Sequence, residues 1–182
     1  IKILPPDVNE SQKHFTYIDN DTIRFGLKAI KWLWDGPIDV LLSEQDKWPF
    51  QSIFDFIERT WGDVINKRAL ESLILSWALD SFGERASLLA SIPKMSAFQK
   101  ELESKRETSQ LWLFDMGDAT LVVHFELERA LPMGLEERNK WEKAMIGYPV
   151  SGHPLEWIEG FIKSKSKNLA AVLDLLHSWN DE

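Results

Sequence analysis

The residues best suited to chemistry surround a turn at Asp35-Gly36. The segment AIKWLWDGPIDVLL, residues 29–42, predicts a short helix, a tight turn and a second helix that begins at Pro37. A turn of this kind points backbone N–H groups and the positive end of a helix at one anion. Two tryptophans crowd this turn, and the indole of Trp34 would shield those N–H groups. We therefore expect a phosphate-binding turn that is partly covered by an aromatic ring.

Basic residues accompany this turn, and a second helix–turn–helix pattern follows it in ALESLILSWALDSFGERASLL. Two such units in tandem can straddle the minor groove of duplex DNA, through phosphate contacts that fix position without reading sequence. The alternative is a pair of plain helical hairpins inside a core. The candidate DNA-binding residues are Lys28, Lys31, Trp34, Asp35, Gly36, Lys67, Arg68, Gly83 and Arg85.

A third candidate is a short peptide, Gln110-Leu111-Trp112-Leu113-Phe114. It offers one glutamine amide for hydrogen bonding and three apolar anchors, which are Leu111, Leu113 and Phe114. The polar stretch at 99–110 favours a helix tail that fades into a flexible linker, so the peptide would be free to dock into a groove on a partner. The alternative is that LWLF packs on its own domain.

Catalytic and metal-binding patterns are weak. The chain has four histidines without ligand spacing and no cysteine. His153 and Ser151 lie close together in SGHPL, but a rigid turn commonly uses histidine as a cap, and no acidic partner is evident. We see no glycine-rich phosphate loop and no closely spaced aspartate pair. We therefore expect no catalytic residue, metal ion or cofactor in this segment.

Composition narrows the class of protein. The 182 residues are 44% hydrophobic and 27% charged, as in ordinary globular domains, and nine are tryptophan, which is a high number. The formal charge of −8 argues against attraction of the whole surface to nucleic acid, so any DNA contact must be local. No apolar run is long enough to span a bilayer, and the N-terminus lacks a signal-peptide pattern. We expect a cytoplasmic protein that does not contact a membrane.

The elements that would position these residues are mostly helical. FTYIDNDTIRFGL predicts a short β-hairpin, and apolar stripes at helical spacing predict helices from residue 29 onward, with Asn66 as an N-cap. The expected fold is mainly α: a helix-hairpin-helix bundle with a short N-terminal β-hairpin, a flexible linker and C-terminal helices. The expected divisions are 1–28, 29–98, 99–120 and 121–182.

Several segments, taken in order, resemble the alpha subunits of bacterial DNA polymerase III, the C-family replicative polymerases. They are LPPDVNES, IRFGLKAIK, DGPI, NKRALESLI, ALDSFGERASLL, QLxLF and YPVSGHPLE. The likeness covers roughly residues 1–158. It implies the region between the fingers and the oligonucleotide-binding fold, which contains a helix-hairpin-helix element. Gln110, Leu111, Leu113 and Phe114 match the family's internal clamp-binding peptide.

The resemblance implies a segment that binds duplex DNA and the sliding clamp (beta subunit) among other holoenzyme subunits, and so supports processive replication. The parent would be a DNA-directed DNA polymerase, a nucleotidyltransferase whose catalytic carboxylates and Mg²⁺ lie in the palm, upstream of this segment. Two alternatives remain open. One is a stand-alone helix-hairpin-helix repair protein such as a glycosylase, and the other is a purely structural helical adaptor.

The sequence departs from the family at its tryptophans. The family usually has glycine where Trp34 and Trp77 stand, and often a small residue at Trp32 and Trp48. Glycine suits positions with positive φ, where another residue costs on the order of 1–2 kcal/mol. Trp112 falls at a variable motif position, so docking should survive. The glycine-to-tryptophan changes suggest a reassigned codon decoded as tryptophan, with deliberate substitution as the alternative.

Overall fold

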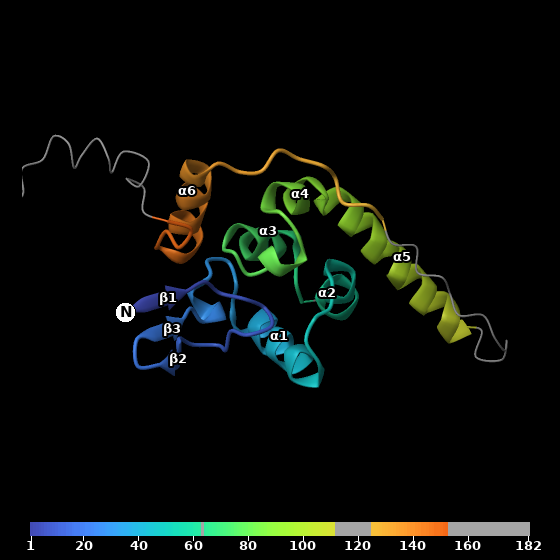
Figure 1. Cartoon of the computed structure of the whole chain (residues 1–182). Coiled ribbons are helices and arrows are strands. Elements are labelled where there is room, and N and C mark those ends of the chain that lie inside the picture. Colours follow the sequence, from blue (N-terminus) through green and yellow to red (C-terminus); the bar gives the residue numbers. More distant parts are fainter. Residues whose placement is uncertain (63, 112–124, 153–182) are drawn as a thin grey trace, which may run out of the picture.

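The N-terminal sheet carries the predicted hairpin. The computed structural model describes residues 1–62, 64–111 and 125–152, and within 105–111 it describes the backbone alone (Figure 1). Strands β2 (Thr16–Asp19) and β3 (Thr22–Arg24) pair antiparallel, which confirms the hairpin. Strand β1 (Lys2–Leu4) pairs in parallel with β3 and was not predicted, because it is short and precedes two prolines.

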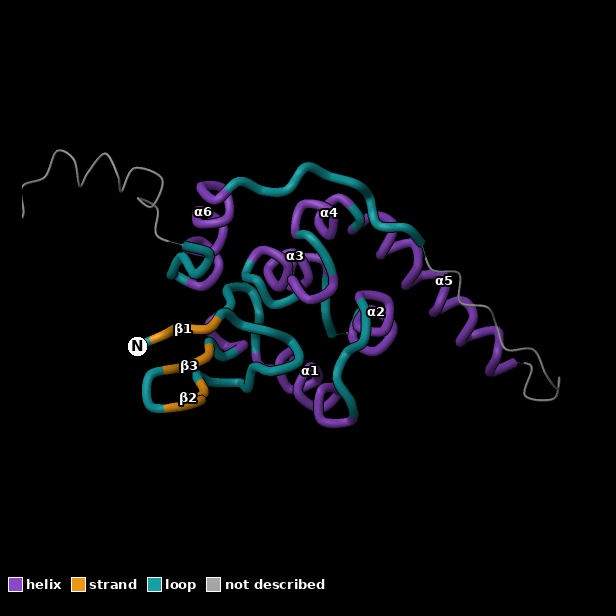
Figure 2. Tube along the Cα trace, viewed as in Figure 1, coloured by secondary structure: helices purple, strands orange, loops and turns teal. Residues whose placement is uncertain are grey.

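The rest of the described chain is mainly helical, as predicted, and α3 lies in the middle of the helical body (Figures 1 and 2). The helices are the 3₁₀ turns η1 (Leu27–Ala29) and η2 (Asp80–Phe82), and α1 (Asp35–Lys47), α2 (Ile53–Thr60), α3 (Lys67–Leu75), α4 (Arg85–Ala90), α5 (Ile92–Leu111) and α6 (Leu135–Ile146).

Helix α3 anchors the core. Asn66 is its N-cap, as predicted, and the Asn66 side-chain oxygen accepts a hydrogen bond from Ala69 N–H at 2.9 Å. Leu70, Leu73 and Ile74 repeat at helical spacing and are completely buried. Because these three side chains are packed in the core, α3 is held in place, and its first two residues, the cations Lys67 and Arg68, have a fixed position on the surface.

The structure of residues 29–42 differs from the predicted helical hairpin. The predicted helix before the turn is absent, because residues 30–34 continue from η1 without regular structure, and Asp35-Gly36 form the first turn of α1. Leu27, Ile30 and Leu33 are all buried. Their spacing of three residues fits the three-residue turn of a 3₁₀ segment better than the 3.6 residues of an α-helix.

Helix α5 is longer than predicted. The sequence predicts a helix tail within 99–110 that fades into a flexible linker. In the structure, Pro93 lies in the first turn of a helix that is continuous to Leu111. The polar residues of this stretch have high helix propensity. Buried Met95, Phe98 and Leu102 attach α5 to the core along one narrow stripe. The division of the chain into domains stays a prediction.

Two tryptophans occupy backbone that favours glycine. Among the described residues, Trp32 (φ +66°) and Trp77 (φ +88°) are the only ones other than glycine with a positive φ. Trp34 is different: its φ is −99°, so the strain that a positive φ would impose is absent at Trp34. Trp32 and Trp77 each follow a 3₁₀ or α-helical segment that is packed in the core, and the core therefore imposes both turns.

The gene provides a check on the codon hypothesis. If codon reassignment placed tryptophan in these turns, Trp32 and Trp77 should share a codon that differs from the codon of Trp141, which lies inside α6 where glycine is unfavourable. Sequencing the gene tests this. One codon for all three residues would contradict it.

Candidate nucleic-acid interface

Two cations from distant segments meet at Trp32. The Arg68 guanidinium carbon lies 3.5 Å from the Trp32 ring centroid, and Lys31 Nζ lies 5.3 Å from it. Arg68 belongs to the first turn of α3, whereas Lys31 and Trp32 belong to the loop before α1. All three side chains are exposed, Trp32 at 43%. The structure therefore brings together two of the predicted DNA-binding cations.

The start of α1 lies two residues after this cluster and has no side-chain cap. Trp34 is the N-cap residue, is 51% exposed and gives the helix no side-chain hydrogen bond. Helices α2, α3 and α4 each have a side-chain cap. Pro37 has no N–H, so the backbone donors of the first turn of α1 are those of Asp35 and Gly36. Uncapped donors at a helix start attract anions.

The negative charge of the Asp35 carboxylate would repel an anion at the start of α1. Asp35 Oδ1 lies 3.0 Å from both Lys13 Nζ and Lys28 Nζ. Hydrogen bonds from Lys28 and Lys13 lower the pKa of Asp35 below its usual value, so the carboxylate is charged at neutral pH. Lys28 is therefore partly neutralised, and Lys31 and Arg68 are the stronger candidates for phosphate.

The local charge is positive although the chain is acidic. We define the basic turn surface as η1, the loop before α1, the first two turns of α1 and of α3, and Lys13, which pairs with α1. It contains five cations and three carboxylates, a formal charge of +2 against −8 for the whole chain. The cations are Lys13, Lys28, Lys31, Lys67 and Arg68, and the carboxylates are Asp35, Asp39 and Glu71.

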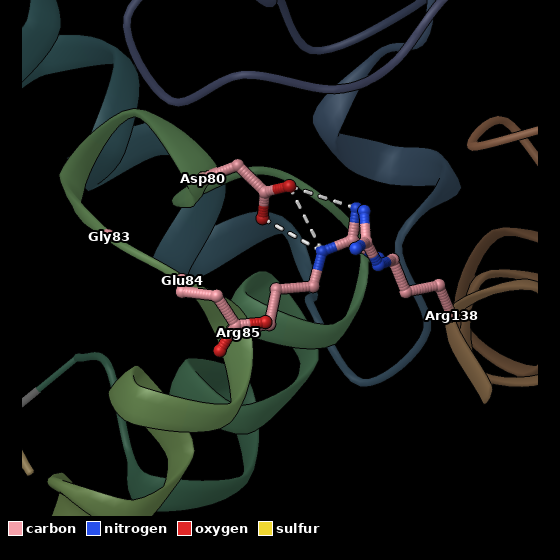
Figure 3. Close-up of a pocket in the computed structure, with 5 residues that line it drawn as sticks. All are labelled: Asp80, Gly83, Glu84, Arg85 and Arg138. Carbon is pink, nitrogen blue, oxygen red and sulfur yellow. Dashed lines mark hydrogen bonds and ion pairs between the residues drawn. The ribbon is translucent and has the colours of Figure 1, made fainter. Parts of the chain in front are cut away.

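The second predicted turn differs from the first, because its cation Arg85 is buried and points toward the Asp80 carboxylate (Figure 3). Arg85 is 3% exposed, and its Nε and Nη2 each lie 2.9 Å from a carboxylate oxygen of Asp80. Its Nη1 lies 2.7 Å from Oε1 of Glu142, which is completely buried. Burial opposes a charge on Arg85, but Asp80 and Glu142 together raise the pKa of the guanidinium. Arg85 therefore offers no exposed cation to phosphate in this structure, and its assignment to DNA contact stays a prediction from the sequence.

Three backbone donors near the second turn also have acceptors within the protein. Gly83 N–H donates to Asp80 O at 3.4 Å, and the Glu84 carboxylate accepts from Ala86 N–H and Ser87 N–H at the start of α4. The cavity here, about 170 Å³, is lined by both acidic and basic residues: Asp80, Gly83, Glu84, Arg85 and Arg138. The Gly83 N–H already has an acceptor, so Gly83 is a weaker candidate for phosphate than the start of α1, and its assignment to DNA stays a prediction from the sequence.

Sequence reasoning missed Glu142 and its partners. Glu142 accepts hydrogen bonds from Val150 N–H at 2.7 Å, from Ser151 N–H at 2.8 Å and from the Ser151 hydroxyl. The carboxylate thus ties α6 and the start of SGHPL to the second turn through Arg85. The sequence signal that could have found Glu142 is its position four residues before Ile146, which places a charged residue on the same face of α6 as an apolar one.

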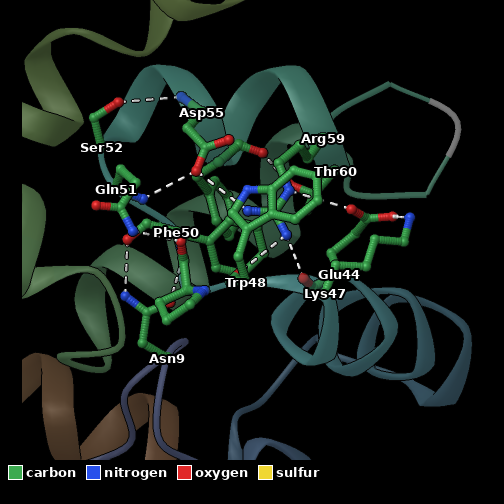
Figure 4. A network of polar contacts seen from close by, with 12 residues as sticks. Asn9, Glu44, Lys47, Trp48, Phe50, Gln51, Ser52, Asp55, Arg59 and Thr60 are labelled. Atoms are coloured by element: carbon green, nitrogen blue, oxygen red, sulfur yellow. Dashed lines mark hydrogen bonds and ion pairs between the residues drawn. The ribbon is translucent and has the colours of Figure 1, made fainter.

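A second polar network braces α1 against α2 (Figure 4). Arg59 lies with its guanidinium carbon 4.8 Å from the Trp48 ring centroid and 4.3 Å from that of Phe50. The same side chain pairs with Glu44 and Asp55, each at 3.2 Å. All donors of Arg59 face protein acceptors, so this network stabilises the fold and offers no free cation to a ligand.

Comparison with known proteins connects this geometry to a family. The helix-hairpin-helix motif family matches residues 1–88, which include the basic turn surface. The chain is 37% identical over 156 residues to the DNA polymerase III subunit alpha of Thermus aquaticus, covering 85% of this chain. It is 35% identical over 175 residues to that of Deinococcus radiodurans, and 32% identical over 195 residues to that of Pseudomonas fluorescens. The chain is a relative of the helix-hairpin-helix region of DNA polymerase III alpha subunits.

This relationship concerns a small part of those subunits. The chain spans 12% of the Thermus aquaticus relative, 13% of the Deinococcus radiodurans relative and 16% of the Pseudomonas fluorescens relative. In the described part of the chain, no helix is long and apolar enough to cross a bilayer, and no group of three or more acidic or histidine side chains is arranged to hold a metal ion.

The predicted clamp-binding peptide lies mostly outside the described residues. Gln110 and Leu111 are the last residues of α5, where the structure gives the backbone alone. Leu113 and Phe114 lie outside the described residues. The assignment of the four residues to clamp binding therefore stays a prediction from the sequence.

Proposed function

We propose that this chain binds duplex DNA through its basic turn surface, as a segment of a replicative polymerase alpha subunit. The observation that carries the proposal is the meeting of Lys31 and Arg68 beside the uncapped start of α1. Cations next to free backbone donors suit phosphate oxygens. The helix-hairpin-helix match over the same residues supports this assignment.

The contact would be local and independent of base sequence. The described part of the surface offers point charges and N–H donors to the DNA backbone, and such contacts position a duplex without reading bases. Because the remainder of the chain is acidic, binding by this segment alone should be weak and should depend steeply on salt.

Substitution of the two cations tests the proposal. The Lys31→Gln/Arg68→Gln double variant should bind a duplex more weakly than the parent chain, because up to two phosphate contacts are lost. The slope of log K against log salt should fall by roughly 0.9 for each lost contact. Fluorescence anisotropy with a labelled duplex at several salt concentrations measures both quantities.

Lys140→Gln is the matched control, because Lys140 is an exposed lysine of α6 that is not part of the basic turn surface. It should leave the slope unchanged. Equal slopes for the parent chain and the double variant would contradict the proposal, and absence of duplex binding at low salt would favour a purely structural adaptor.

We further propose that the QLWLF peptide tethers the polymerase to its sliding clamp. Gln110, Leu111, Leu113 and Phe114 provide one amide and three apolar anchors, which suits docking into a partner groove. A tether of this kind raises the effective concentration of polymerase at the clamp and so supports processive synthesis. Polymerase activity with Mg²⁺, and contacts with other holoenzyme subunits, would belong to the remainder of a longer polypeptide.

A further inference from the structure

The indole of Trp32 lies against the cations that the proposed function assigns to phosphate. Arg68 stacks on the ring at 3.5 Å, and Lys31 Nζ lies 5.3 Å from the same centroid. Neither cation forms an ion pair with a carboxylate in the described part of the chain. We propose that Trp32 restrains these two cations, so that the side chain at position 32 sets how strongly this surface holds DNA phosphates. This inference rests on the proposed function.

The backbone at Trp32 does not need an indole. Its φ of +66° is the left-handed region, which suits glycine. The turn is fixed on both sides by other groups: Lys31 N–H donates to Met145 O of α6 at 2.8 Å, and Leu33 N–H donates to Ile30 O at 3.3 Å. Ile30 and Leu33 are buried. The turn would therefore persist with another residue at position 32, while the restraint on the cations would disappear.

The restraint acts by attraction between a cation and an aromatic face. A guanidinium over an indole gains electrostatic attraction and loses part of its conformational freedom. Phosphate must then compete with the ring for the same side chain. Removal of the ring frees Arg68 and Lys31 to follow a DNA backbone, and each additional phosphate contact displaces further counterions.

Trp77 provides an internal control. It also has positive φ, at +88°, and its ring also lies near a guanidinium, with the Arg85 carbon 4.8 Å from the centroid. Arg85, however, is buried and held by Asp80 and Glu142. Replacement of Trp77 by glycine therefore relieves the same kind of backbone strain without releasing a surface cation.

The test compares three variants of the 182-residue chain by salt-dependent anisotropy with a labelled duplex. Trp32→Gly and Trp32→Leu should both steepen the slope of log K against log salt, because the ring leaves each cation only part of a phosphate contact in the parent chain. This gain and the slope lost in Lys31→Gln/Arg68→Gln should together reach roughly 0.9 for each cation, which corresponds to roughly 3.5-fold in affinity between 50 and 200 mM salt. Trp77→Gly should leave the slope unchanged. Trp32→Gly should melt about 2–4 °C above Trp32→Leu, because only glycine relieves the strain.

The outcomes separate this inference from the function on which it rests. Unchanged or shallower slopes in both Trp32 variants, with duplex binding intact and sensitive to Lys31→Gln/Arg68→Gln, would overturn the restraint and leave the proposed function standing. A steeper slope in Trp77→Gly as well would also overturn it, because strain relief alone would then explain the gain. Insensitivity of binding to Lys31→Gln/Arg68→Gln would overturn the proposed function itself.

Discussion

Replacement of Arg85 by alanine should lower the free energy of unfolding by about 3–5 kcal/mol, the usual cost of removing one partner from a buried ion pair. The variant would leave the Asp80 and Glu142 carboxylates without their shared cation, and Glu142 is completely buried. The loss should be measured by urea denaturation, as a fall in the midpoint at unchanged slope.

The deficit of this variant should depend on pH. Burial already raises the pKa of Asp80 above its usual value, although Arg85 acts against the shift. Without Arg85 the folded-state pKa of Asp80 rises further above the unfolded value, near 4. Such groups favour the folded state at low pH and disfavour it as pH rises through the folded pKa. The difference in the free energy of unfolding between Arg85→Ala and the parent chain should therefore become smaller as the pH falls.

Arg138→Ala is the matched control for Arg85→Ala. Arg138 lines the same cavity, but it is only half-buried and its Nε donates to Met133 O at 2.9 Å. Its loss should cost about 1 kcal/mol, the typical value of one hydrogen bond. If Arg85→Ala were no more destabilising than Arg138→Ala, the buried network would not hold α6 against the second turn.

The double variant Leu113→Ala/Phe114→Ala should lose at least roughly 30-fold in affinity for a sliding clamp, the effect of removing one strong anchor residue. Apolar anchors dominate such peptide interfaces because they are fully desolvated in the partner's groove. Titration of the clamp by surface plasmon resonance or calorimetry provides the comparison.

Trp112→Ala is the corresponding control, since Trp112 occupies the variable position of the motif. It should bind the clamp nearly as well as the parent chain. Equal clamp binding by the parent and the Leu113→Ala/Phe114→Ala variant would remove the motif assignment, and it would leave the DNA-binding proposal unaffected.

Much of the fold followed from local patterns. Asn66 and the apolar stripe of α3 predicted that helix because a cap and a 3.6-residue period are both local properties. The hairpin β2–β3 followed from its polar turn. The structure of the segment before α1 was not predictable in the same way. Leu27, Ile30 and Leu33 repeat every three residues, and this spacing is close to that of an α-helix although the segment begins with a 3₁₀ turn.

The candidate site was predictable in part. Lys31 and Arg68 were both named from the sequence, but their convergence on Trp32 depends on tertiary packing of α3 against the loop before α1. Arg85 was mistaken for a surface cation because its partner Glu142 lies 57 residues later in the chain. A single sequence gives no indication of such a long-range pairing.

We expect DNA to contact the basic turn surface and not the second turn. Titration of the ¹⁵N-labelled chain with a short duplex, followed by amide chemical shifts, tests it most directly. We predict that the shifted amides cluster at residues 31–36 and 67–69, and that those of residues 80–85 remain in place. Shifts confined to residues 80–85, with the amides of residues 31–36 unmoved, would contradict the account.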